Sequence, residues 1–80
     1  MRAVILVRPK AGILDPQGEA VRSSLQALGF AVSSARVGRI VDIELEASDP
    51  ASARAEVERM CAELLANPLI ESVEIEVVGQ

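Results

Sequence analysis

Nucleophiles, general bases and metal ligands are scarce in this sequence. Its 80 residues include no histidine and a single cysteine, Cys61. Histidine is the commonest general base and metal ligand near neutral pH, so both roles lack their usual residue. Cys61 falls beside Met60 on the apolar stripe of an expected helix, where a thiol is inert and packs as core. Without a histidine to activate it or a second cysteine to share a metal, the sequence predicts no catalytic residue and no metal site.

Carboxylates are the second group that could carry chemistry. Six of them fall on or beside two expected strands: Asp42, Glu44, Glu46, Glu71, Glu74 and Glu76. Pairs of carboxylates can perform acid–base catalysis or hold Mg²⁺. Their alternation with apolar residues is explained more simply by the solvated side of half-buried strands, or by charges that protect a sheet edge. We favour this structural interpretation.

The stretch from Arg8 to Gly18 joins an expected strand to an expected helix through a glycine-bearing loop. Such a loop can bind an anion, but its spacing matches neither the Walker A nor the G-x-G-x-x-G pattern. Asp15 at the helix start would also repel a phosphate. A rigid loop is a common recognition surface, and we predict that a partner protein binds here. Two arginines near a later turn could be interface anchors or solvated charges. The candidate partner-binding residues are Lys10, Gly12, Asp15, Gln17, Arg36 and Arg39.

These residues must be positioned by two helices and a set of strands. Asp15-Pro16 and Asp49-Pro50 are helix starts, because aspartate caps the free amides of the first turn and proline suits the first helical position. The first helix ends at Gly29, and the second ends before Pro68. Apolar and alternating segments predict strands over residues 2–8, 30–37, 39–46 and 70–78.

The resulting order is βαββαβ, with Gly38 at a tight central turn. Two right-handed crossovers in one sheet give an α+β, ferredoxin-like two-layer sandwich. We expect an antiparallel sheet with both helices on one face, forming a single domain over residues 1–80.

Composition narrows the range of partners. The formal net charge is −4 and the only aromatic residue is Phe30. A nucleic-acid binder of this size would show a basic face and stacking aromatics, so we expect no nucleic-acid partner. The longest apolar stretches are too short to cross a membrane. One cysteine and no signal peptide predict a protein of the reducing cytoplasm.

The first strand is apolar on both faces, which is typical of a strand covered on both sides. We therefore predict a homodimer or higher homo-oligomer that pairs sheet against sheet through Ala3, Ile5 and Val7. The alternative is that a central strand tolerates small exposed apolar patches.

Residues Lys10 to Gly18 resemble the signature loop and helix start of the PurS family, the small subunit of phosphoribosylformylglycinamidine synthase. Leu28-Gly29-Phe30, Arg36 to Arg39, and Cys61 to Pro68 with Ile70-Glu71 are similar to the family in order and spacing. The resemblance covers nearly the whole chain. Arg39 stands where lysine is more common, which keeps the charge and changes the geometry.

The resemblance implies a role in de novo purine synthesis. A PurS subunit would join an ATP-dependent synthetase subunit to a glutaminase subunit and help ammonia pass between them. ATP and Mg²⁺ would bind the large subunit, leaving no cofactor on this chain. The alternative that the residues leave open is a ferredoxin-like regulatory domain that senses a small molecule, because fold alone does not choose between such roles.

Overall fold

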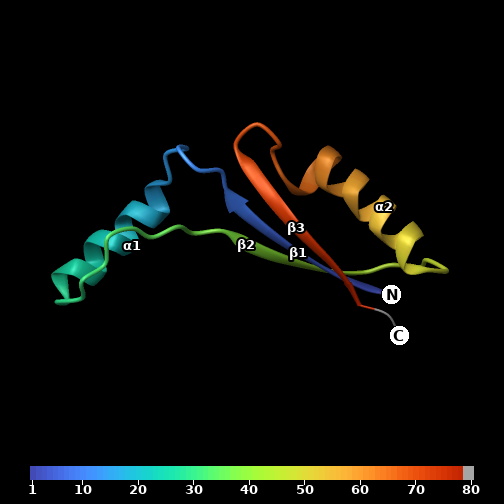
Figure 1. Ribbon diagram of the computed structural model, residues 1–80, viewed down its shortest axis with the longest axis horizontal. Coiled ribbons are helices and arrows are strands. Elements are labelled where there is room, and N and C mark those ends of the chain that lie inside the picture. Colours follow the sequence, from blue (N-terminus) through green and yellow to red (C-terminus); the bar gives the residue numbers. More distant parts are fainter. Residues whose placement is uncertain (79–80) are drawn as a thin grey trace.

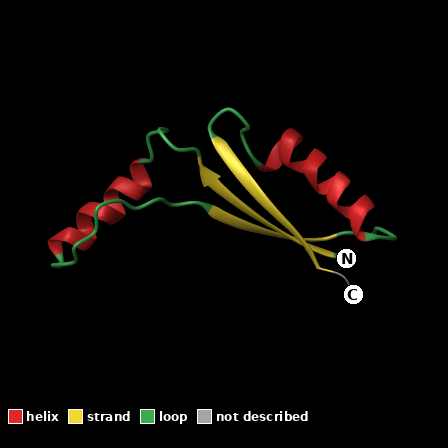
Figure 2. Cartoon of the chain, in the orientation of Figure 1, coloured by secondary structure: helices red, strands yellow, loops and turns green. Residues whose placement is uncertain are grey.

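The computed structural model describes residues 1–78, so the last two residues of the expected domain lie outside the described range. Strand β1 (Arg2–Pro9) leads to helix α1 (Pro16–Ala27) and then to strand β2 (Arg39–Glu44). Helix α2 (Pro50–Met60) continues directly into the π-helical turn η1 (Cys61–Leu65), and strand β3 (Glu71–Val78) follows (Figures 1 and 2). The order of the described elements is therefore βαβαβ.

The three described strands form an antiparallel sheet in the order β2-β1-β3. The central strand β1 pairs with both neighbours, and Ile5 lies opposite Val41 on one side and Ile75 on the other. Directly opposite residues in antiparallel strands point to the same face of the sheet. The register therefore fixes which side chains of β2 and β3 share a face with Ile5.

Helix α2 covers one face of this sheet and creates the core. It packs against β3 and β1, and Val57 and Cys61 are buried against the strands. The predicted dimer-interface residues Ala3, Ile5 and Val7 are at most 1% exposed within this single chain. Their assignment to an open face was wrong, because α2 covers the face of β1 on which they lie. Both faces of β1 are apolar, so the alternation of residues does not indicate which face a helix covers. The other side of β1 carries Val4 and Leu6, which are half-buried.

The strand predicted over residues 30–37 is absent, which corrects the ferredoxin-like order. This segment runs back along α1 instead (Figure 1). The amide of Phe30 donates to the Leu25 carbonyl, and the Gln26 side chain donates to the Val32 carbonyl at 2.8 Å. The Phe30 amide and the Val32 carbonyl are therefore not available for the hydrogen bonds of a strand. The α+β class and the antiparallel sheet are confirmed.

Helix α1 does not join α2 on the sheet, contrary to the expected placement of both helices on one face. It projects away from the strands, and it has no extended contact with any of them within residues 1–78 (Figure 1). The chain measures 50 × 27 × 14 Å, and its radius of gyration is 15.9 Å. A compact domain of this length would have a radius of gyration of about 12 Å. The chain is thus elongated because one helix is held apart from the core.

Both predicted helix starts are confirmed. Asp15 accepts a hydrogen bond from the Gly18 amide, Asp49 accepts one from the Ser52 amide, and a proline follows each cap. Gly29 has a φ of 97° just after α1, a backbone conformation that glycine adopts without strain. None of the described helices is long and apolar enough to cross a membrane.

Two isoleucines on opposite faces of the sheet test the position of the core. Ile5 is fully buried beneath α2, whereas Ile40 on β2 is 65% exposed on the other face. We expect Ile5→Val to lower the free energy of unfolding by about 0.5–1.5 kcal/mol through the cavity it leaves. Ile40→Val should change it by less than about 0.5 kcal/mol, as for most surface substitutions. Urea denaturation at one fixed chain concentration measures both, and equal losses would contradict the assigned faces.

Candidate functional site

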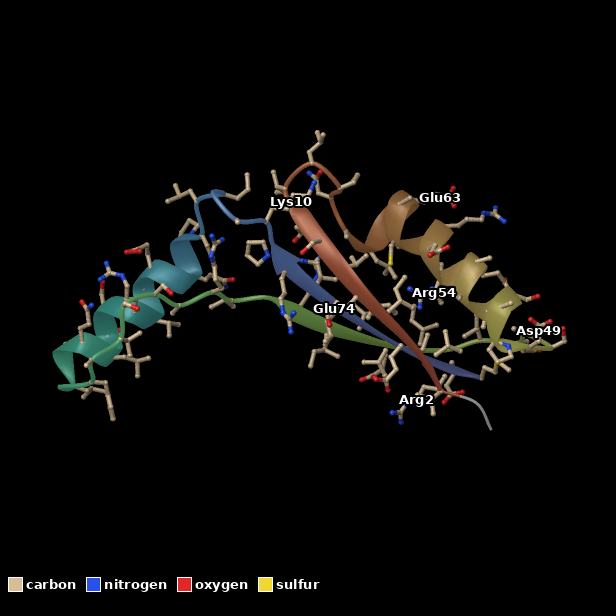
Figure 3. The ribbon with its side chains drawn as sticks, viewed as in Figure 1. Arg2, Lys10, Asp49, Arg54, Glu63 and Glu74 are labelled. Atoms are coloured by element: carbon tan, nitrogen blue, oxygen red, sulfur yellow. The ribbon has the colours of Figure 1, made fainter. Side chains whose placement is uncertain are left out.

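Three connecting segments meet where α1 leaves the sheet, and we call this region the loop junction (residues 10–15, 36–39 and 65–71). The Lys10 amide donates to the Ile70 carbonyl at 2.9 Å, and the Lys10 ammonium reaches the Pro68 carbonyl at 2.6 Å (Figure 3). The guanidinium of Arg36 donates to the carbonyls of Lys10 and Ile13, each at 3.2 Å. Segments far apart in the sequence are therefore fastened together at this point.

Asp15 is the central residue of the junction. One carboxylate oxygen accepts from the Gly18 amide at 3.1 Å, and the other accepts from the Val37 amide at 2.9 Å. The Val37 amide first, and then the Gly18 amide, hold the pKa of Asp15 below its ordinary value. A Cβ added to Gly18 would collide with the Ala35 carbonyl oxygen. The start of α1 is thus locked to the segment that returns from its far end.

Arg39 forms the second fixed point of the junction. It makes two hydrogen bonds to the Glu71 carboxylate, the shorter at 2.8 Å, and another to the Leu65 carbonyl at the end of η1. The Arg39 guanidinium, followed by the Asn67 amide, holds the pKa of Glu71 below its ordinary value. Arg39 therefore joins the start of β2 to the start of β3. It also donates to the Leu65 carbonyl, which lies at the end of η1 where helical carbonyls lack an intrahelical partner.

The structure brings together most of the predicted partner-binding residues. Lys10, Asp15, Arg36 and Arg39 all hold backbone or side chains of the junction in place, as described above. Gly12 is exposed on the same loop with a φ of 85°. Gln17 is exposed and shares a hollow of about 250 Å³ with Asp15 and Arg39. Whether these six residues contact a partner remains a prediction.

Gly38 differs in detail from its expected role. It does not have a positive φ, and no hairpin forms around it within the described chain. A Cβ at this position would instead collide with the Val7 carbonyl oxygen. Glycine is therefore required because β1 and the start of β2 approach each other closely here.

The contacts of the loop junction fix the positions of its three segments, and they do not assemble a catalytic or metal-binding group among the described residues. The four charged side chains of the junction that sequence analysis selected are engaged by backbone groups or by Glu71. Cys61 is buried, and burial raises the pKa of its thiol, which disfavours the reactive thiolate. No three potential metal-ligating side chains cluster within residues 1–78. The region offers a rigid surface with its polar groups already occupied.

Two features of the region were missed by sequence reasoning. The Arg39–Glu71 pair joins residues 32 positions apart, and no local pattern signals such a pairing. The second lies beyond the junction, where Val21 on α1 is 41% exposed and Leu28, just after the helix, is 74% exposed. The helical spacing of these residues predicts an apolar stripe, but it does not indicate that the stripe lies away from the chain's own sheet.

Comparison with known proteins identifies relatives along almost the whole chain. The family model described as PurS, phosphoribosylformylglycinamidine (FGAM) synthase, matches residues 2–79. The phosphoribosylformylglycinamidine synthase subunit PurS of Synechocystis sp. is 43% identical, covering 98% of this chain and 77% of the relative.

Solved structures share the same fold. The crystal structure of Methanocaldococcus jannaschii PurS, a subunit of formylglycinamide ribonucleotide amidotransferase in purine biosynthesis, superposes with a TM-score of 0.83 at 36% identity. That match covers 94% of this chain and 92% of the other. A chain in the structure of PurLQS from Thermotoga maritima superposes with a TM-score of 0.85 at 32% identity, covering 94% of this chain and 93% of that one.

Acid titration tests the role of Asp15. Because the folded-state pKa of Asp15 is lowered, the unfolded chain binds its proton more readily, and the stability that this carboxylate contributes is lost as pH falls below about 4. In Asp15→Asn one acceptor oxygen is replaced by an amide donor, so the side chain can no longer accept from both the Gly18 and the Val37 amides. We expect Asp15→Asn to lower the urea midpoint at pH 7 and to show a smaller further loss between about pH 5 and pH 2, the range in which carboxylates titrate.

The matched control is Asp42→Asn, which removes the same charge from an exposed position on β2. It should leave the urea midpoint at pH 7 nearly unchanged. An Asp15→Asn variant with the wild-type midpoint at pH 7 and the wild-type acid response would show that this carboxylate does not hold the junction.

Proposed function

The chain belongs to the PurS family of phosphoribosylformylglycinamidine synthase, and we propose that it is a non-catalytic subunit that holds the synthetase and glutaminase subunits of that enzyme together. The observation that carries this proposal is the loop junction, a rigid surface whose charged groups are engaged within the chain. Such a surface is pre-organised for docking, because little conformational entropy remains to be lost when a partner binds.

The nature of the partners follows from the relatives. The Thermotoga maritima chain described above is part of PurLQS. By likeness, this chain would join a PurL synthetase subunit and a PurQ glutaminase subunit in the cytoplasm. ATP and Mg²⁺ would bind the synthetase subunit, and ammonia released by the glutaminase would be used there. The relatives reported above give no support to the alternative of a small-molecule-sensing domain.

We also propose that the chain is a homo-oligomer within this assembly. Its elongated shape and the exposed apolar stripe of α1 support self-association, because contiguous apolar surface on a small domain marks an interaction site. The residues first assigned to such an interface are core, so the contact must use other surfaces.

Reconstitution tests the bridging role directly. The synthetase and glutaminase subunits are assayed for amidine formation with glutamine as the nitrogen source, with and without this chain. We expect the glutamine-dependent rate to fall at least about tenfold when the chain is omitted, a loss equivalent to about 1.4 kcal/mol of activation free energy. Full glutamine-dependent activity without the chain would contradict the proposal.

The same mixture supplied with ammonium in place of glutamine is the internal control. If the chain acts by bringing two active subunits together, its omission should affect the ammonium-dependent rate less than the glutamine-dependent rate. Equal losses with both nitrogen sources would instead point to a direct effect on the synthetase reaction, and would contradict a purely bridging role.

A further inference from the structure

We infer that an arginine-lined hollow, on the face of the sheet that α2 does not cover, receives a carboxylate side chain and a neighbouring apolar side chain from one of the two larger subunits. We call it the arginine hollow, and the residues that carry the argument are Leu6, Arg8, Arg36, Arg39 and Ile40. The inference rests on the proposed function, because it assigns a docking surface to subunits that the chain would hold together. It deepens that proposal by naming the chemistry of the bound group.

The hollow lies where β1 ends and β2 begins, and its volume is about 490 Å³. Leu6 lies opposite Ile40 on β2 and opposite Glu74 on β3. Its neighbours along β1, Ile5 and Val7, are buried on the α2 side, so Leu6 points to the other side. Glu74 lies on the side of the sheet away from α2 (Figure 3). The hollow therefore opens on the uncovered face.

The apolar part of the lining is accessible to a partner. Ile40 is 65% exposed, and Leu6 beside it is half-buried. Adjoining apolar side chains that remain exposed on a small domain mark an interaction site. The hollow thus offers a contact for an apolar side chain.

The charged part of the lining consists entirely of arginines among the described residues. Arg8, Arg36 and Arg39 line the hollow together, in a chain whose formal net charge is −4. A concentration of one sign of charge attracts groups of the opposite sign. Guanidinium groups match carboxylates in geometry as well as in charge, because two N–H donors can bind two oxygens.

Two of these arginines keep donors for a further acceptor. Within residues 1–78, Arg8 donates to Glu74 through Nη1 alone, at 2.8 Å. Arg36 also bonds through Nη1 alone, to two backbone carbonyls of the loop junction. The Nε and Nη2 groups of both side chains therefore retain N–H donors. Arg36 is paired with no carboxylate in this part of the chain, and the neighbouring Asp15 accepts from two backbone amides instead.

Arg39 forms a fixed wall of the hollow. Both of its terminal nitrogens are engaged, by Glu71 and by the Leu65 carbonyl. Glu71 balances much of its charge, as Glu74 does for Arg8, so Arg36 contributes most of the unbalanced positive charge. Arg36 and Arg39 also belong to the loop junction. The hollow is therefore continuous with the surface on which the proposed function depends.

The exposure of the hollow favours a protein segment over a small molecule. A small-molecule site encloses most of the surface of its ligand. Here the Arg8 side chain is 59% exposed, and Ile40 is 65% exposed. An apolar side chain with a carboxylate beside it, on a protruding part of a partner subunit, would cover Ile40 and reach the guanidinium groups at the same time.

The other end of the same face carries the opposite charge. Val4 lies there between Asp42 and Glu76. A partner that placed its carboxylate over this end would be repelled, whereas the same group over the arginine hollow is attracted. The distribution of charge therefore fixes the orientation in which an acidic segment can dock.

Binding to the two larger subunits together tests the hollow. A labelled chain is titrated with their mixture, and its Kd is measured by sedimentation velocity for the wild type, Arg8→Ala and Arg59→Ala. Arg59 is an exposed arginine on α2 and is the matched control. We expect Arg8→Ala to raise the Kd at least about tenfold and Arg59→Ala to leave it within about twofold. Equal Kd values for the two variants would overturn the inference.

A carboxylate supplied by the chain itself gives an independent measure. Ile40→Asp removes the apolar contact and offers the arginines an internal partner. Leu64→Asp makes the same kind of change at a leucine that is 84% exposed outside the hollow. We expect Ile40→Asp to raise the Kd at least about tenfold and Leu64→Asp to leave it within about twofold. A wild-type Kd for Ile40→Asp, in a variant that unfolds at the wild-type temperature, would contradict the inference.

Carbodiimide coupling identifies the bound group. Lys10 is the only lysine of the sequence, so Arg8→Lys introduces a second lysine amine, within the hollow. We expect this amine to couple to an aspartate or glutamate of one larger subunit, and the amine of Arg59→Lys not to do so. Coupling confined to Glu74 of the same chain would overturn the inference. Coupling to a second copy of the chain would also overturn it, by assigning the hollow to self-association.

Free anions test the alternative source of a carboxylate or phosphate. Glutamate or inorganic phosphate, added to the isolated chain at constant ionic strength, should leave the unfolding temperature unchanged because the open hollow holds such ions weakly. A rise that Arg8→Ala abolishes would assign the hollow to a small anion and overturn the inference.

These outcomes are separable from those of the bridging proposal. An unchanged Kd for Arg8→Ala, with the glutamine-dependent rate still dependent on the chain, would overturn only the role of the hollow. Binding through the hollow, with full glutamine-dependent activity in the absence of the chain, would overturn only the bridging function. A wild-type chain that binds neither larger subunit would overturn both.

Discussion

The Asp15 carboxylate fastens the start of helix α1 to the segment that returns from its far end. Asp15 caps α1 with one oxygen and accepts from the Val37 amide with the other, so the two ends of the segment 15–37 are held at one point. The same residue type at the other helix, Asp49, caps α2 through Ser52 and through no comparable long-range bond in the described chain. The two helix starts therefore differ in one long-range hydrogen bond, although both consist of aspartate followed by proline. One helix packs on the sheet and the other projects from it.

A three-stranded sheet with one helix offers a small core. The fully buried large side chains of the described residues are Ile5, Val7 and Val57. Burying one such side chain stabilises a fold by about 1.5–3 kcal/mol, which is modest against the entropy of ordering 80 residues. A chain of this size commonly gains further burial by association. The exposed apolar residues of α1 and the half-buried Val41 and Ile43 on β2 leave apolar surface that association would cover.

The sequence was informative where local chemistry decides the structure. Aspartate followed by proline marked both helix starts, and a run of apolar residues marked β1. Residues 3–7 are all apolar, so the sequence of this strand does not indicate which of its faces α2 covers. The sequence predicts a strand over residues 30–37, but hydrogen bonds to Leu25 and Gln26 hold this segment beside α1. Both outcomes depend on which contacts compete most effectively in the folded chain, and the pattern of residue types alone does not rank those contacts.

The candidate site was also predictable only in part. The glycine-bearing loop and the arginines near residue 38 stood out by composition, and four of the six selected residues do fasten the junction. Glu71 is one of the six carboxylates that the sequence analysis interprets as solvated, and no local pattern distinguishes it from Glu74 and Glu76. Its bond with Arg39 arises from the pairing of the strands on either side of β1. Such long-range pairs have no signature in a single sequence.

The central claim is that α1 is held away from its own sheet. Spin labels on Ser23→Cys in α1 and Glu56→Cys in α2, in a Cys61→Ala background, allow the distance between the helices to be measured. Dilution with an excess of unlabelled chain restricts the measurement to one molecule. The account predicts a separation that is a large part of the 50 Å long axis. Helices packed side by side on one sheet would have axes about 10 Å apart, and a distance near that value would contradict the account.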